Sequence, residues 1–337
     1  MSACAAILGC SGPTLTAEEA AFFRAVKPWG FILFGRNVET PGQVRRLTDD
    51  LRGRVERGDA PILVDQEGGR VARLKPPHWK RYPPGRAYGE LPPESRREVT
   101  RLGARLLAHD LAAVGVNVDC LPVLDVRDTE GHEVIGDRAY SDDAAEVAAL
   151  GRAAAEGLLA GGVLPVAKHM PGHGRAAADS HEALPVVEAS VEALETRDFA
   201  PFRALADLPM AMTAHVIYAA IDGARPATTS ARVFERVIRG AIGFEGLVMS
   251  DDLAMQALDG GFAERAERSR AAGCDVVLHG EGDMSAMRQV AEGAGALEGK
   301  AAERARAALA RLPARPEPFD AAEGRARFDA AFEGRYA

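Results

Sequence analysis

The sequence predicts an α/β protein built as a single TIM-type (β/α)8 barrel. Short apolar runs alternate with longer amphipathic segments along the whole chain, which is typical of strand–helix units that feed a parallel sheet. The predicted strands are residues 5–9, 30–34, 61–64, 116–121, 164–168, 209–214, 246–250 and 275–279. Eight strands with intervening helices match this barrel.

The segments between the strands carry helical signals. ESRREVTRLGARLLAHDLAAVG and DDAAEVAALGRAAAEGLLAGG place apolar residues three and four apart and end in a glycine that can cap a helix. KAAERARAALARL adds a further helix, so residues 1–337 are predicted to form one barrel domain with an extra C-terminal helix and tail at about 300–337. A doubly wound open sheet is the alternative, but GCSGP lacks the GxGxxG pattern of a dinucleotide site.

The composition excludes several classes of protein. No apolar run approaches the roughly 20 residues that a membrane-spanning helix needs. A net charge of −8 without a Lys/Arg-rich run argues against nucleic acid as a partner. The four scattered cysteines suit reduced thiols, and the start lacks the basic segment of an export signal, so a cytoplasmic protein is expected. The sequence is silent on oligomeric state, and we expect a monomer.

Catalytic groups in this type of barrel lie at the carboxyl ends of the strands and on the loops that follow them. Polar residues are concentrated at these predicted positions. They are Asp65 at the end of the third strand, Asp125 at the end of the fourth, Lys168 and His169 at the end of the fifth, His215 at the end of the sixth, Asp251 and Asp252 at the end of the seventh, and Asp137 and Arg138 in the loop IGDRAY. We therefore expect a polar site at this end of the barrel.

The run SDDLAM indicates a nucleophile. An apolar strand delivers Asp251 directly to the mouth of the barrel, where a carboxylate can attack a substrate or stabilise a cation. The alternative is helix capping, since Ser and Asp are both good N-caps. Two adjacent acids allow both roles, and we expect Asp252 to cap the following helix.

The loop KHMPGHGRAAADSHEALP carries a possible acid. Asp179 and His181 are two residues apart, so an extended backbone points both side chains to the same side. A neighbouring carboxylate raises the pKa of an imidazole, which lets His181 hold a proton near neutral pH. His169 and His173 have an HxxxH spacing, but the intervening proline and glycine forbid a helix. A zinc site of His169, His173 and His181, as in a metal-dependent barrel hydrolase, is an alternative.

A carboxylate nucleophile, a proton-donating dyad and several cationic donors at one mouth favour glycoside hydrolysis. That reaction needs one group to attack the anomeric carbon and one acid to protonate the departing oxygen. Lys168, His169, Arg73 and Arg138 can donate hydrogen bonds to sugar hydroxyls. A catalytically silent sugar-binding barrel is the competing interpretation.

The motifs KHMPGHGRAAADSHEALP, VDQEGGRVARL, VIGDRAYSDD, MTAHVIYAAIDGARPAT and VMSDDLAM closely resemble the β-N-acetylglucosaminidases of glycoside hydrolase family 3 that act in bacterial cell-wall recycling. The resemblance covers nearly the whole chain. It implies a retaining double displacement with Asp251 as nucleophile and His181, supported by Asp179, as acid and then base. The positions that match the family's sugar-binding residues are Asp65, Arg73, Arg138, Lys168 and His169.

The resemblance also implies a substrate, a terminal N-acetylglucosamine β-linked to 1,6-anhydro-N-acetylmuramic acid with or without a stem peptide, and no metal or cofactor. Transfer to phosphate instead of water is an alternative, because a histidine repels a phosphate less than a carboxylate does. Met170 departs from the aromatic residue common in the family, which puts the packing of the loop in doubt. The role of His173 is open between loop structure and substrate contact.

Overall fold

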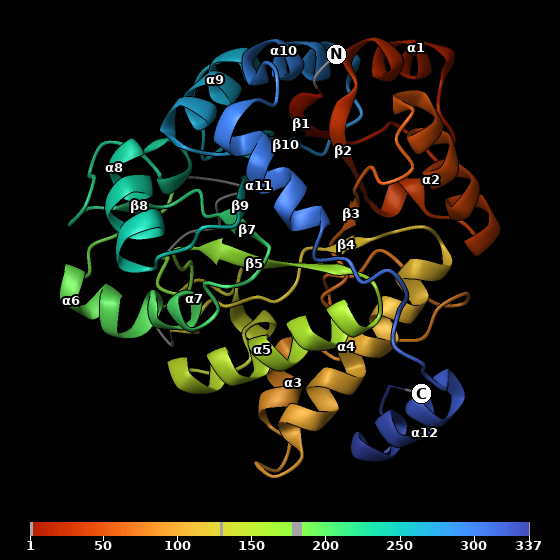
Figure 1. The fold of residues 1–337 in the computed structure, drawn as a ribbon. Helices are drawn as coiled ribbons and strands as arrows, with labels where there is room; N and C mark the ends of the chain where they lie inside the picture. The colour runs from red at the N-terminus through yellow and green to blue at the C-terminus, as the bar shows by residue number, and fades with distance from the viewer. Residues whose placement is uncertain (1–2, 129–130, 177–183, 337) are drawn as a thin grey trace.

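The structure, a computed structural model, describes residues 3–128, 131–176 and 184–336. Eight parallel strands close into a barrel in the order β1-β10-β9-β7-β5-β4-β3-β2 (Figure 1). Their bounds are β1 Cys4–Leu8, β2 Pro28–Leu33, β3 Ile62–Val64, β4 Val118–Asp119, β5 Leu164–Met170, β7 Met210–Thr213, β9 Leu247–Asp252 and β10 Val276–His279. The predicted barrel is confirmed, and each of the eight predicted runs overlaps one of its strands.

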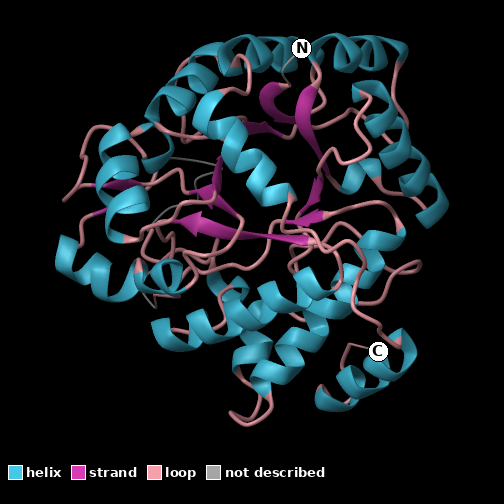
Figure 2. Ribbon diagram, in the orientation of Figure 1, coloured by secondary structure: helices cyan, strands magenta, loops and turns pink. Residues whose placement is uncertain are grey.

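Helices cover the outside of the barrel (Figure 2). The longer ones are α1 Ala17–Val26, α2 Pro41–Val55, α4 Arg96–Ala113, α5 Ala144–Ala160, α9 Phe262–Ala272, α10 Met284–Ala294, α11 Gly299–Leu309 and α12 Ala321–Ala331. The shorter ones are α3 Gly85–Gly89, α6 Val191–Ala193, α7 Ala200–Ala204 and α8 Ala231–Val233. Capping side chains fix several starts: Thr16 forms a capping box with Glu19, and Asp143 accepts the backbone N–H of Glu146.

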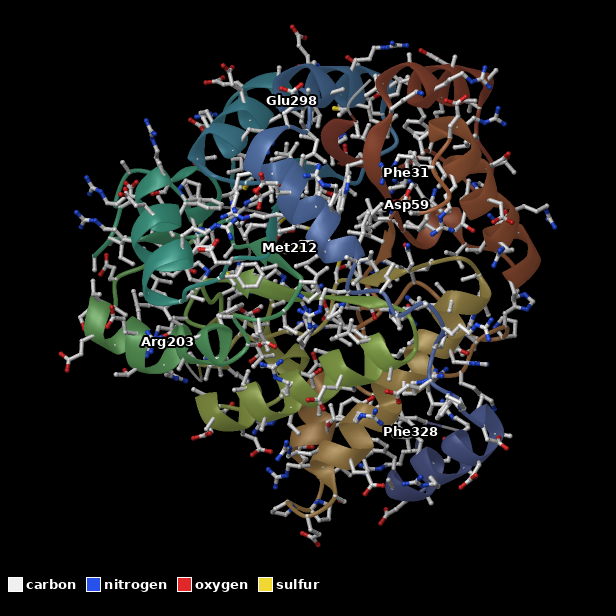
Figure 3. All side chains as sticks on the ribbon, in the orientation of Figure 1. Phe31, Asp59, Arg203, Met212, Glu298 and Phe328 are labelled. Atoms are coloured by element: carbon white, nitrogen blue, oxygen red, sulfur yellow. The ribbon has the colours of Figure 1, made fainter. Side chains whose placement is uncertain are left out.

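The barrel strands are buried on both faces because helices lie outside them and side chains fill the interior. β1, β2, β5 and β7 contain no exposed residue, and Figure 3 shows Phe31 and Met212 among the packed side chains. This explains why the strands read in the sequence as continuous apolar runs and not as alternating ones. The polar residues that interrupt the pattern come at the strand ends, where the site lies.

Two features were absent from the prediction. β6 Val186–Val187 and β8 Ile217–Tyr218 pair in parallel as a separate two-stranded sheet. The tail beyond the predicted helix folds into a second helix, α12, which packs against α4. In Figure 1 the C-terminus lies beside this helix, at the edge of the molecule. No helix in the described part of the chain is long and apolar enough to cross a membrane.

The expectation that Asp252 caps a helix is wrong. The chain after β9 runs through turns, and the next helix, α9, begins ten residues later at Phe262 with Gly261 as its N-cap. The Asp252 carboxylate instead accepts the backbone N–H of Ala254 at 2.9 Å and that of Gly280 at 3.1 Å. It therefore ties the end of β9 to the end of β10.

Candidate active site

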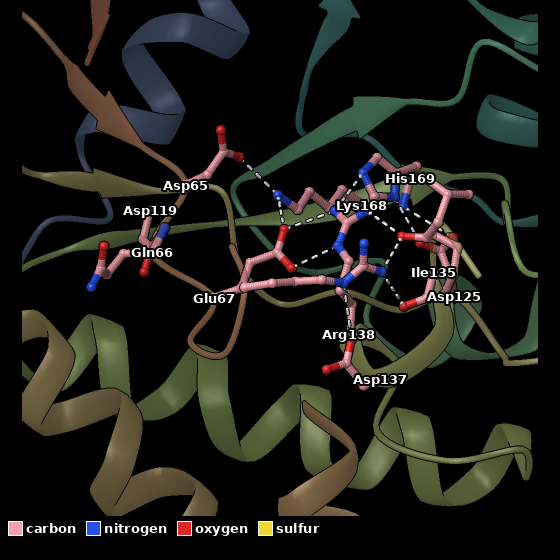
Figure 4. Close-up of polar contacts among 12 residues, drawn as sticks. Asp65, Gln66, Glu67, Asp119, Asp125, Ile135, Asp137, Arg138, Lys168 and His169 are labelled. Atoms are coloured by element: carbon pink, nitrogen blue, oxygen red, sulfur yellow. Dashed lines mark hydrogen bonds and ion pairs between the residues drawn. The ribbon is translucent and has the colours of Figure 1, made fainter. Parts of the chain in front are cut away.

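Lys168, near the end of β5, is the buried centre of an ion-pair network (Figure 4). Its Nζ lies 2.9 Å from Asp65 Oδ1 and 2.6 Å from Glu67 Oε1, and only 2% of its side chain is exposed. Burial lowers the pKa of Lys168, but the two carboxylates more than offset this, so its net pKa is raised. The ammonium group is therefore a permanent charge.

Glu67 joins Lys168 to Arg138. The Nε and Nη2 atoms of Arg138 donate to the two oxygens of Glu67, each at 2.8 Å, in a bidentate pair. Burial raises the pKa of Glu67, but Arg138 and Lys168 lower it to about 2 overall. The prediction named Asp65, Arg138 and Lys168 but missed Glu67, although it follows Asp65 by two residues in the same motif.

The turn after Glu67 explains how a carboxylate is held there. Gly68 and Gly69 both have a positive φ, of 97° and 55°, which favours glycine. The backbone N–H groups of Glu67 and Gly68 both donate to the carbonyl of Val71, at 2.9 and 3.1 Å. The tight turn therefore directs Glu67 back into the barrel mouth, beside Lys168.

Arg73 forms a second ion pair with Asp65. Its Nη2 donates to Asp65 Oδ2 at 3.1 Å, and its guanidinium lies 5.2 Å from the centre of the Phe34 ring. Burial raises the pKa of Asp65, but Lys168 and Arg73 bring it below its ordinary value. Asp65 is thus ionised, and both of its oxygens already accept hydrogen bonds.

His169 is oriented from two sides. Its Nδ1 lies 2.6 Å from Asp125 Oδ2, and its Nε2 lies 3.3 Å from Arg138 Nη2. Arg138 can only donate, so we assign the proton of the neutral ring to Nδ1, which donates to Asp125. Burial raises the pKa of Asp125, but His169 and then His173 lower it to about 2. Asp125 lies in the loop six residues past β4, not at the strand end as expected.

Asp251 lies at the end of β9 and lines the same cleft. Its Oδ1 accepts the backbone N–H of Asp252 at 2.8 Å. Burial raises its pKa, but His215, His169 and the Asp252 N–H together lower it by more, so the net pKa lies below the ordinary value of an aspartate. His215 is itself fully buried, with Nδ1 2.7 Å from Thr228 Oγ1 and Nε2 3.0 Å from the Asp252 carbonyl. Asp251 is therefore an ionised carboxylate in a buried setting.

The cleft has a volume of about 590 Å³. It brings together every predicted site residue that the structure describes. Its lining includes Asp65, Arg73, Arg138, Lys168, His169 and Asp251, together with Glu67, Asp252 and His173. Asp179 and His181 lie outside the described residues.

His173 and Met170 differ in their environments. The backbone N–H of His173 donates to Asp125 Oδ1 at 2.7 Å, and burial and the neighbouring His169 lower the pKa of its ring to about 4. Its ring centre lies 5.8 Å from that of His169.

Met170 is 1% exposed and belongs to the hydrophobic core. Within the described residues, no group of three or more His, Cys, Asp or Glu side chains is arranged to hold a metal ion.

Comparison with known proteins identifies the family. The chain matches the family model "Glycosyl hydrolase family 3 N terminal domain" over residues 15–312. A β-hexosaminidase of Methylococcus capsulatus is 41% identical over 271 residues, which cover 79% of this chain and 80% of that protein.

Two solved structures have the same fold. One is a glycoside hydrolase family 3 β-N-acetylglucosaminidase from Paenibacillus, with a TM-score of 0.86 and 29% identity over 97% of this chain and 67% of that chain. The other is native NagZ from Neisseria gonorrhoeae, with a TM-score of 0.84 and 31% identity over 99% of this chain and 97% of that one. The resemblance seen in the sequence motifs is confirmed, and the chain belongs to glycosyl hydrolase family 3.

Proposed function

We propose that this glycosidase is a retaining exo-β-N-acetylglucosaminidase that removes terminal β-linked N-acetylglucosamine from muropeptides. The observation that carries the proposal is the ionised Asp251 at the end of β9, in a cleft that also holds the Lys168, Glu67 and Arg138 network. The names of the Methylococcus and Paenibacillus relatives support the sugar.

In this proposal Asp251 attacks the anomeric carbon. A bond forms between its Oδ2 and that carbon as the bond to the leaving oxygen breaks, and Oδ1 keeps its hydrogen bond from the Asp252 N–H. The carboxylate first stabilises the positive charge that develops on the sugar ring and then forms the glycosyl-enzyme. Because Asp251 is already ionised, no proton has to be removed from the nucleophile.

His181 is the proposed acid, with Asp179 as its partner. In the first step, the imidazolium gives its proton to the leaving oxygen; in the second, the neutral imidazole accepts a proton from the water that attacks the anomeric carbon. The water releases Asp251, and the product keeps the β-configuration. Asp179 holds the ring in orientation and favours its charged form.

The sugar hydroxyls are proposed to bind the polar network. Asp65 can accept hydrogen bonds, Arg73, Arg138 and Lys168 can donate them, and His169 can accept one at Nε2 in place of its contact with Arg138. These side chains are already fixed by one another, so little conformational freedom is lost when a sugar binds. A rigid set of donors and acceptors suits the recognition of one terminal sugar.

The proposal also includes the leaving group of the substrate. The leaving group is a 1,6-anhydro-N-acetylmuramic acid with or without a stem peptide, which would place the enzyme in cytoplasmic peptidoglycan recycling. We expect it to work as a monomer without a metal or cofactor.

The test compares hydrolysis of an aryl N-acetyl-β-glucosaminide with that of the aryl β-glucoside, each with and without phosphate and with a chelator. We expect turnover of the first substrate, free N-acetylglucosamine as the product, and no effect of chelator. A sugar 1-phosphate as the main product would replace hydrolysis by phosphorolysis. Loss of activity with chelator, restored by zinc, would favour the metal-dependent hydrolase.

A further inference from the structure

We propose that the C-terminal helix α12 positions the active site, and that Arg325 is the residue through which it acts on the turn beside Glu67. The inference uses the site of the proposed function but concerns its support and not its reaction. α12 lies wholly beyond residue 312, where the match to the family model ends. It begins at Ala321 after the N-cap Asp320 and packs against α4; Figure 3 shows its Phe328 on the side facing the body of the protein.

Arg325 contacts residues 81 and 82, which precede α3 in the chain. Its Nη1 and Nη2 both donate to the carbonyl of Arg81 at 3.3 Å. Its guanidinium lies 5.4 Å from the centre of the Tyr82 ring and 5.3 Å from that of Phe328. Only 14% of the Arg325 side chain is exposed. A guanidinium enclosed in this way fixes residues 81 and 82 against the helix.

The segment that Arg325 holds is in direct contact with the turn beside Glu67. The Tyr82 carbonyl accepts the N–H of Gly69 at 2.9 Å. A Cβ atom on Gly68 would lie 2.1 Å from the carbonyl oxygen of Pro83, so the two backbones touch without space for a side chain. Glu67 directly precedes this turn. A displacement of residues 82 and 83 must therefore move the turn and the carboxylate with it.

A second path leads from α12 to Arg138. The buried rings of Phe328 and Phe332 pack on Tyr88 of α3, with ring centres 6.2 and 5.4 Å apart. α3 in turn lies against the site loop, because a Cβ atom on Gly85 would be 2.2 Å from the carbonyl oxygen of Arg138. The segments that carry Glu67 and Arg138 thus rest on one helix. α12 sets the spacing of this ion pair, which also holds Lys168.

The experiment compares Arg325→Met with Arg327→Met. Arg327 lies on the same helix, but it is 56% exposed and pairs with Glu98, away from residues 81–83. Two quantities are measured on the folded proteins: hydrogen–deuterium exchange of peptides covering residues 66–72, and kcat/KM on an aryl N-acetyl-β-glucosaminide. We expect Arg325→Met to speed exchange in residues 66–72 and to lower kcat/KM about 10-fold, because small misplacements of binding groups are costly. Arg327→Met should change neither.

A double-mutant cycle separates positioning from general stabilisation. If Arg325 acts through Glu67, Arg325→Met should lower kcat/KM less than twofold in a Glu67→Gln background. The proposal would be overturned if Arg325→Met lowered kcat/KM by the same factor with and without Glu67→Gln. It would also be overturned if hydrogen–deuterium exchange at residues 66–72 were unchanged in Arg325→Met. If Arg325→Met does not fold, Arg325→Lys, which keeps the charge but loses the two-pronged contact with the Arg81 carbonyl, takes its place in the same cycle. A wild type without glycosidase activity would overturn the proposed function, whereas the exchange measurement would still decide the role of α12.

Discussion

Replacement of Glu67 by glutamine should destabilise the protein and its site together. The Glu67 side chain is 4% exposed and is the shared partner of Arg138 and Lys168. Its pKa is about 2 instead of 4.5. A pKa difference of one between the folded and unfolded protein corresponds to about 1.4 kcal/mol. The ionised group therefore contributes about 3 kcal/mol to the free energy of unfolding at neutral pH. Breaking a buried ion pair costs a similar amount.

The dependence on pH has a definite sign. Because folding lowers the pKa of Glu67, its contribution is complete above pH 4.5 and is lost as the pH falls from about 4.5 to 2. Glu67→Gln should therefore be less stable than the wild type by about 3 kcal/mol at pH 7. The two proteins should approach each other in stability as the pH falls through this window.

Urea unfolding at several pH values measures this difference, and kcat/KM at pH 7 measures the effect on the site. We expect kcat/KM to fall about 100-fold, since Arg138 and Lys168 lose their fixed geometry. Glu245→Gln is the matched control: Glu245 pairs with Arg304 but is 69% exposed, so its loss should cost less than about 1 kcal/mol. A difference below about 1 kcal/mol for Glu67→Gln, or one independent of pH, would show that the ionised Glu67 does not stabilise the folded protein in this way.

Three further results are expected. Asp251→Ala should lower the rate by several orders of magnitude with an unchanged fold by circular dichroism; more than a tenth of the activity remaining would move the nucleophile to Asp252. In a plot of log rate against leaving-group pKa, His181→Ala should have a steeper slope than wild type and Asp179→Ala an intermediate one, whereas parallel lines would exclude the acid role. Burial, and secondarily the Asp251 charge, raises the pKa of Asp252 to about 7, so the free energy of unfolding of the wild type should fall as the pH rises from 4 to 7. Urea unfolding of Asp252→Asn should show no such fall. An identical fall in both proteins would contradict the assignment to Asp252.

The barrel could be predicted from the sequence because its strands are buried on both faces. The first four residues of β5, LPVA, are apolar, and the first ionisable residue after them, Lys168, lies near the end of the strand. That rule located Lys168, His169 and Asp251, which line the cleft in the structure. It depends only on local sequence and on the general geometry of the barrel.

Features that depend on distant contacts could not be predicted. Glu67 meets Arg138 and Lys168 across separations of 71 and 101 positions in the sequence, so nothing beside it in the chain marks it as their partner. α12 has a glycine in its middle and few large apolar residues, and the packing of Phe328 and Phe332 on distant tyrosines helps to stabilise it. The predicted helix cap at Asp252 failed because its carboxylate finds two backbone N–H groups without a helix.

The proposed reaction passes through a covalent intermediate on Asp251. The most direct measurement is incubation with a 5-fluoro derivative of an activated N-acetyl-β-glucosaminide, followed by peptide mapping by mass spectrometry. We expect stoichiometric labelling of the peptide that carries the SDDLAM motif, with the sugar on Asp251, and no labelling of Asp251→Ala. Labelling of another residue, or release of an oxazoline formed by the substrate's own acetamido group, would contradict it.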